Sequence, residues 1–160
     1  MMQIMDILPL LLAWGLDLCF GDPVWMPHPV VGFGKLISKG EHVLNQGTKR
    51  FLKGTLLTLV LVIGTFVLTA FVLECLPGFL HWIVSAFLIF CCLAGTTLIR
   101  EVRDVFRAVD RSLDEGRKQV ARIVGRDTSE LSAQEVRTAA LETLAENLSD
   151  GVIAPLFWYA

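Results

Sequence analysis

The carboxylates near the end of the chain are the residues best suited to chemistry. Glu142, Glu146 and Asp150 are spaced four residues apart, directly before an apolar run. On a helix that turns about 100° per residue, these three side chains share one face. Like charges at this spacing repel one another, and acids near a helix C-terminus oppose the helix dipole. A hard cation such as Mg²⁺ would relieve both penalties, because it binds carboxylate oxygens. The alternative is a solvated acidic face that pairs with arginines elsewhere.

A second candidate is the stretch GRDTSEL at 125–131. Arg126 is always charged, and its planar guanidinium suits phosphate or carboxylate groups. Asp127 and Thr128 offer oxygen atoms directly beside it. The stretch therefore fits a site that holds an anion, although an ordinary loop between two helices has the same residue types.

A third candidate is LDLCFGDPVWMPHPVVGFGK at 16–35, which contains Asp22, His28 and Lys35. Its prolines predict an extended segment, because a residue before proline is biased away from the helical region. The segment lies next to an apolar run, so a rigid turn at the membrane surface is the alternative interpretation. The sequence contains no GxxxxGK[ST] phosphate loop that would place a nucleotide.

The composition predicts what must position these residues. Apolar residues make up 54% and charged residues 19%, with a mean hydropathy of +0.60, which is typical of membrane proteins. A net charge of −2 gives no reason to expect a nucleic-acid partner. Segments of the length and polarity needed to cross a bilayer are expected at 55–73 and 80–99, with a weaker one at 4–20 and the start of another at 152.

The distribution of positive charge predicts an orientation. All 14 Lys and Arg residues lie in the two long loops, 21–54 and 100–151, and the short turn at 74–79 has none. Because cytoplasmic loops are enriched in Lys and Arg, both long loops are expected in the cytoplasm. In a bacterium this topology corresponds to the inner membrane, with membrane lipids around the spans.

The loop 100–151 carries patterns of its own. Apolar residues recur there at helical spacing: Val102, Val105, Phe106, Val109, Leu113, Val120 and Val124. They predict an amphipathic helix, or two helices broken near Gly116 and ending at Gly125, packed on neighbours or lying on the membrane. Ser132 and Glu135 have capping-box spacing and predict a further helix to about Leu148. The predicted fold is an all-α, polytopic integral membrane protein with helical cytoplasmic loops, and residues 1–160 form part of one membrane domain.

Three motifs in this order resemble one family. They are DxxFGDPxxxPHPVxxxGK at 17–35, IVGRDTSEL at 123–131 and ETLAENLSDGVIAPLFW at 142–158. The chain resembles the N-terminal half of the CobD/CbiB family, the adenosylcobinamide-phosphate synthases of cobalamin biosynthesis. The resemblance implies an ATP-dependent ligase that joins the free propionate of cobyric acid, a corrinoid, to aminopropanol or its phosphate. Other enzymes of cobalamin assembly are further candidate partners.

The resemblance and the chemistry together assign expected roles. Glu142, Glu146 and Asp150 bind Mg²⁺ or position the amine, and Asn147 hydrogen-bonds substrate. The residues expected to bind phosphate or to close the site are Arg126, Asp127, Thr128, Asp22, His28 and Lys35. Two other classes remain open, a transporter subunit and a scaffold of the assembly pathway. A transporter would place ionisable groups at the middle of its spans, and the two clear spans have none there.

Overall fold

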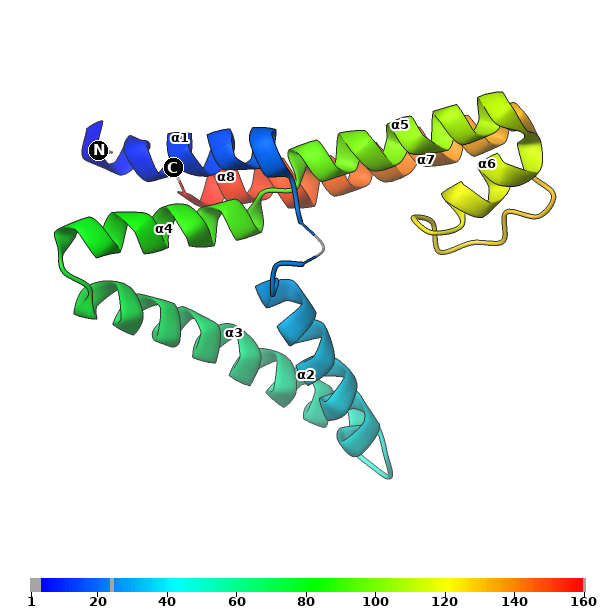
Figure 1. Ribbon diagram of the computed structural model, residues 1–160. Helices are drawn as coiled ribbons and strands as arrows, with labels where there is room; N and C mark the ends of the chain where they lie inside the picture. Colours follow the sequence, from blue (N-terminus) through cyan, green and yellow to red (C-terminus); the bar gives the residue numbers. More distant parts are fainter. Residues whose placement is uncertain (1–3, 24, 160) are drawn as a thin grey trace. The chain divides into compact units, whose positions relative to one another are not determined.

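A computed structural model describes residues 4–23 and 25–159, and within these ranges the chain forms helices and no strand (Figure 1). The predicted all-α fold is confirmed. The chain divides into two compact units, residues 1–23 with 88–160, and residues 24–87. Two apolar stretches, Arg50–Cys75 and Gly78–Arg111, have the length and composition to cross a membrane, as a polytopic membrane protein requires.

The unit 24–87 contains α2 (Pro29–Leu44), α3 (Arg50–Cys75) and most of α4 (Gly78–Cys92). The ring nitrogen Nδ1 of His28 accepts the N–H of Val30 and caps α2, which has Pro29 in its first turn. The predicted extended conformation of 16–35 is therefore wrong at 16–20, which end the helix Ile4–Phe20, and again beyond His28. A glycine allows α2 to approach α3 closely, since a Cβ at Gly40 would lie 2.5 Å from Leu57.

The predicted span 55–73 lies wholly within α3. A tight turn at Leu76 and Pro77 joins α3 to α4, and the ring nitrogen Nδ1 of His81 lies 2.9 Å from the carbonyl of Leu73 across it. The predicted span 80–99 is not one continuous helix. It is interrupted at Leu93 and Ala94, between α4 and α5.

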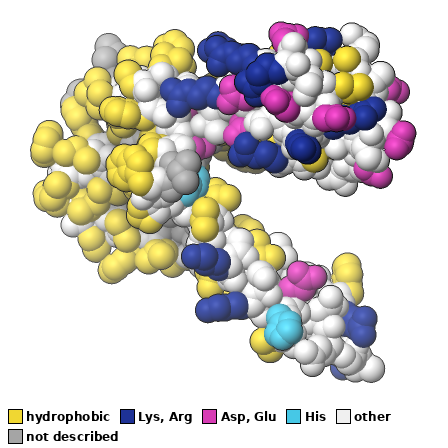
Figure 2. Space-filling view, turned by 45° about the vertical axis from the view of Figure 1, so that its right-hand side comes forward, with side chains coloured by type: hydrophobic (Ala, Val, Ile, Leu, Met, Phe, Trp, Pro, Cys, Tyr) yellow, Lys and Arg dark blue, Asp and Glu magenta, His cyan; other side chains and the backbone are white. Residues whose placement is uncertain are grey.

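The other unit contains α1 (Ile4–Phe20), α5 (Gly95–Arg111), α6 (Leu113–Val120) and α7 (Ala133–Leu148). A π-helix, Ser149–Ile153, then joins α7 to α8 (Ala154–Tyr159). In Figure 1, α5 and α7 run side by side and α6 packs beside them. Figure 2 shows acidic and basic side chains gathered over this α5–α7 part of the surface.

Packing among α5, α6 and α7 buries the predicted apolar stripe. The core consists of Val105, Val109, Val120, Val136, Ala139 and Ala140, and Val102, Phe106, Leu113 and Val124 pack against it. The stripe thus faces neighbouring helices, and burial of this area from water holds the three helices together. Arg137 of α7 also donates to Asp110 of α5 at 2.7 Å.

Two predicted boundaries in this unit are wrong. The break between α5 and α6 falls at Ser112, whose hydroxyl accepts the N–H of Glu115 and caps α6. Gly116 instead sits inside α6, where a Cβ would lie 2.5 Å from the Val109 side chain. It therefore permits close packing of α6 on α5. The second helix ends at Val120, before Gly125.

Candidate functional site on the polar face of α7

The helix that carries the candidate carboxylates starts where the capping box predicts. Ser132 caps α7 through its hydroxyl, which accepts the N–H of Glu135, and the Glu135 carboxylate accepts the N–H of Ser132 at 2.8 Å. The Ser132 hydroxyl and N–H together lower the pKa of Glu135. Glu135 therefore stabilises the start of α7, and the remaining acids of this face lie further along the helix.

Glu142, Glu146 and Asn147 line a cavity of about 410 Å³ with the loop that precedes α7. We call it the polar cavity. Arg126 enters from this loop, and its Nη2 donates to Oε2 of Glu142 at 2.9 Å. The structure thus brings together four of the residues that the sequence indicates. One cavity thus contains a guanidinium and two carboxylates.

The Arg126–Glu142 ion pair is open to solvent. The two side chains are 55% and 60% exposed, respectively. Ion pairs at such positions contribute about 0–1 kcal/mol to stability, because water screens them and ordering both side chains costs entropy. The pair therefore holds Arg126 in place only weakly, and a bound phosphate could replace Glu142 as its partner.

Asp150 does not join this cavity. It lies in the π-helix Ser149–Ile153, whose wider turn shifts the register after Leu148 away from the α-helical stripe. Among the residues that the structure describes, no group of three His, Cys, Asp or Glu side chains is arranged to hold a metal. The predicted Mg²⁺ site of Glu142, Glu146 and Asp150 stays a prediction, with Asp150 outside the polar cavity. The pair Glu142 and Glu146 fits Mg²⁺ that also takes phosphate oxygens, since protein Mg²⁺ sites commonly use one or two carboxylates.

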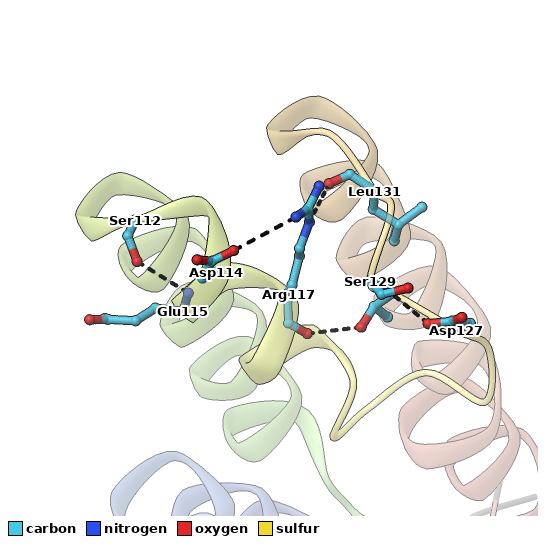
Figure 3. Close-up of polar contacts among 8 residues, drawn as sticks. Ser112, Asp114, Glu115, Arg117, Asp127, Ser129 and Leu131 are labelled. Atoms are coloured by element: carbon cyan, nitrogen blue, oxygen red, sulfur yellow. Dashed lines mark hydrogen bonds and ion pairs between the residues drawn. The ribbon is translucent and has the colours of Figure 1, made fainter.

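Asp127 and Thr128 hold the loop that carries Arg126, and Figure 3 shows the bonds of Asp127 with Ser129 and of Arg117 with Leu131. An Asp127 oxygen accepts the N–H of Ser129 at 3.0 Å, and this bond lowers the pKa of Asp127. Thr128 is buried, and its hydroxyl donates to the carbonyl of Arg117 at 3.1 Å. The Arg117 guanidinium in turn donates to the carbonyl of Leu131 at 2.8 Å. These bonds give Asp127 and Thr128 a role in positioning the loop, and substrate contact by either stays a prediction.

The other predicted site residues are divided between the two units. The backbone N–H of Asp22 donates to the hydroxyl of Thr97 at 2.8 Å in one unit. His28 caps α2 in the other unit, and Lys35 lies exposed on α2. Their convergence with Arg126 therefore stays a prediction.

Sequence reasoning did not include Asp17 among the site residues. Its carboxylate is 3% exposed, and Oδ2 accepts the backbone N–H of Thr96 at 3.1 Å. An acid inside an apolar segment, four residues before a Gly-Asp-Pro turn, was the available signal. Acids inside membrane segments are rare because they are costly, and those that occur are usually buried, paired and functional. Asp17 is therefore a functional candidate.

The comparisons with known proteins agree with this arrangement of motifs. The family model described as CobD/Cbib protein matches residues 10–160. The chain belongs to the CobD/CbiB family. All the predicted site residues fall within the matched range, so the polar cavity of α7 is a feature of the CobD/CbiB part of the chain.

Curated relatives from several bacteria share this similarity. Cobalamin biosynthesis protein CobD of Halalkalibacterium halodurans is 43% identical over 159 residues, which are 95% of this chain and 49% of the relative. CobD of Geobacter metallireducens is 44% identical over 149 residues, or 90% and 47% of the two chains. CbiB of Salmonella arizonae is 38% identical over 162 residues, or 96% and 51%. The chain thus spans about half the length of these CobD/CbiB relatives. No solved structure matches it.

Proposed function

We propose that this chain is part of an ATP-dependent, amide-forming enzyme of cobalamin biosynthesis. The reaction joins the free propionate of cobyric acid to the amino group of aminopropanol or its phosphate, and the product is cobinamide or its phosphate. Family membership supports the pathway. The observation that carries the proposed chemistry is the meeting of Arg126 with Glu142, Glu146 and Asn147 in the polar cavity.

Each side chain has a task that follows from its chemistry. The Arg126 guanidinium binds a phosphate of ATP or of aminopropanol phosphate through two parallel hydrogen bonds. As it turns to the phosphate, Glu142 is released and accepts a cation or the ammonium group of the amine. Glu146, one helical turn further along α7, provides a second carboxylate, and the Asn147 amide orients the substrate through hydrogen bonds.

ATP supplies the activation that a carboxylate needs before an amine can attack it, and Mg²⁺ neutralises phosphate charge. The residues of the polar cavity fit this pair, because they offer one cationic side chain and two carboxylates on adjacent helical turns. The protein would bind these reactants at the cytoplasmic face of the bacterial inner membrane, with the loops 21–54 and 100–151 on that side.

The test compares two arginines in the full natural protein, purified in detergent. Arg126 lines the polar cavity, whereas Arg122 is exposed and donates to the Gln119 side chain. We expect Arg126→Ala to lower kcat/KM for Mg-ATP-dependent cobinamide phosphate formation by about 10- to 100-fold. That factor corresponds to losing a hydrogen bond to a charged group. Arg122→Ala should leave the rate within about two-fold, since the bond it loses is a surface bond. Equal rates for the two variants, or no product from wild type, would contradict the proposal.

A further inference from the structure

One arginine of α6, Arg117, fastens the loop that lines the polar cavity. This loop forms one wall of the cavity and carries Arg126. From residue 125 to 130 its residues are exposed except for Thr128, so this part makes little apolar contact of its own. Leu131 follows and packs against the core of α5, α6 and α7. The position of Arg126 therefore depends on what holds Thr128 and Leu131.

Both of these anchors are bonded to Arg117. The Thr128 hydroxyl donates to the backbone carbonyl of Arg117 at 3.1 Å, and Nε of the Arg117 guanidinium donates to the Leu131 carbonyl at 2.8 Å (Figure 3). One residue thus holds the loop at two points, through its main chain and through its side chain. A hydrogen bond from a charged donor is roughly twice as strong as one between neutral groups. The Arg117 side chain is 26% exposed, so water competes for this bond less than at an open surface.

The guanidinium of Arg117 has one further partner, Asp114 on the preceding turn of α6. Nη1 of Arg117 lies 3.7 Å from Oδ1 of Asp114, whose side chain is 82% exposed. An ion pair that is this long and this open adds little to stability. The donor at Nε, rather than the charge, is therefore the feature of Arg117 that acts on the loop.

We propose that Arg117 is a positioning residue of the polar cavity, and that its Nε–H bond to Leu131 keeps the loop in the conformation that presents Arg126 to a phosphate. The inference rests on the proposed function for the role of Arg126. Without this bond the loop populates further conformations, and only a fraction of the molecules is ready to bind phosphate. The KM then rises by the inverse of that fraction, whereas the saturated enzyme keeps its kcat. Loss of the fold would instead remove active enzyme and lower kcat.

The test compares two side chains that differ in one donor. Glutamine has its Nε2 bonded to Cδ, as arginine has its Nε, so Arg117→Gln keeps an N–H donor at this place without the charge. Arg117→Met keeps an unbranched stem of the same length and has no N–H donor. The control is Arg111→Met on α5, because Arg111 is 67% exposed and bonds to Glu115 rather than to the loop. All variants are made in the full natural protein, purified in detergent.

Amide hydrogen–deuterium exchange measures the loop independently of activity. We expect exchange at 125–131 to rise at least about five-fold in Arg117→Met, because the loop opens more often without its side-chain anchor. Exchange should stay at the wild-type rate in Arg117→Gln and in Arg111→Met. Wild-type exchange in Arg117→Met, or equal increases in Arg117→Met and Arg117→Gln, would overturn the proposal, since the Nε donor would then not hold the loop.

Steady-state kinetics tests the link to Arg126. Mg-ATP and aminopropanol phosphate are each varied, and the relevant KM is the one that Arg126→Ala raises. We expect Arg117→Met to raise the same KM by about five- to ten-fold with kcat within about two-fold, and Arg117→Gln to restore it. In an Arg126→Ala background, Arg117→Met should raise this KM no further, because both changes act through one guanidinium.

Two kinetic results would overturn the role of Arg117. One is an equal rise in KM with and without Arg126, and the other is a fall in kcat alone. Wild-type kinetics in Arg126→Ala would instead contradict the proposed function. The exchange rates at 125–131 would then still show whether Arg117 holds the loop, so the two failures are distinguishable.

Discussion

The two faces of α7 line cavities of similar size and opposite chemistry. The polar cavity has about 410 Å³, and an apolar cavity of about 440 Å³, walled mainly by leucines, lies between α7, α1, α5 and α8. Each contains a carboxylate held by a donor from another element. Glu142 is 60% exposed and is bound by the exposed side chain of Arg126, whereas Asp17 is 3% exposed and is bound by the backbone N–H of Thr96.

This difference predicts different consequences for changes at the two cavities. An exposed side-chain pair costs little to open, so Arg126 and Glu142 can exchange partners when reactants bind. A buried carboxylate on a helix N-terminus is stabilised by the helix dipole and does not exchange readily. The contrast predicts that changes near Asp17 affect stability first, and changes near Arg126 affect binding and rate first.

The largest expected effect on stability comes from Gly21→Ala. Gly21 has φ = 62°, and a Cβ there would lie 3.0 Å from the Thr97 hydroxyl and 3.1 Å from the Arg100 guanidinium. The left-handed backbone alone costs about 1–2 kcal/mol for a residue with a side chain. We expect the midpoint of thermal unfolding, followed by circular dichroism in detergent, to fall by several degrees.

The matched control is Gly15→Ala in α1, where nothing lies within 4 Å of the added Cβ. It should leave stability unchanged or raise it slightly, because alanine favours helix. The folded fraction of Gly21→Ala should bind Mg-ATP as tightly as wild type does. A loss of Mg-ATP affinity in that fraction would show that the two faces of α7 do not act independently.

A smaller effect is expected from Ser132→Ala at the start of α7. Removing this cap should cost about 1 kcal/mol. The pKa of Glu135 is lowered in the folded state by its bonds to Ser132. The contribution of Glu135 to folding stability is therefore fully present above its ordinary pKa of 4.5. It is lost as the pH falls through the lower folded-state pKa.

The measurement for Ser132→Ala is the stability difference from wild type as a function of pH. We expect a difference at pH 7 that narrows as the pH falls below about 4.5, because protonated Glu135 no longer accepts from the Ser132 hydroxyl. A difference that stays constant down to pH 3 would show that the capping box does not link Glu135 to the start of α7.

Local signals predicted much of this fold. The capping box at Ser132 and Glu135 predicted the start of α7, and the valine stripe predicted which residues are buried. The breaks were harder to predict, because they depend on contacts between distant residues. The interruption at Leu93 and Ala94 has neither proline nor a polar run. Its backbone N–H groups bond to distant acceptors, the Asp17 carboxylate and the Gly151 carbonyl. The break at Ser112 did have a local signal, the Ser-x-x-Glu spacing to Glu115.

The candidate site was predictable only in part for a similar reason. Helical spacing placed Glu142 and Glu146 on one face, and the residue types of the 125–131 loop indicated an anion-binding arginine. The same helical spacing also predicts Asp150 on this face. The π-helix Ser149–Ile153 shifts the register, so the prediction fails there. The second cavity depends on how α1 packs against α5 and α8, which the sequence pattern alone does not specify.

The most direct test of the central claim compares two glutamates of the full natural protein. Glu146 lines the polar cavity, and Glu130 is exposed in the loop before α7. With cobyric acid, aminopropanol phosphate and Mg-ATP, Glu146→Gln should lower kcat for cobinamide phosphate formation at least about 100-fold, as loss of a catalytic carboxylate does. Both Glu146→Gln and Glu130→Gln should insert in membranes, and Glu130→Gln should turn over at the wild-type rate. Wild-type turnover by Glu146→Gln would contradict the assignment of chemistry to the polar face of α7.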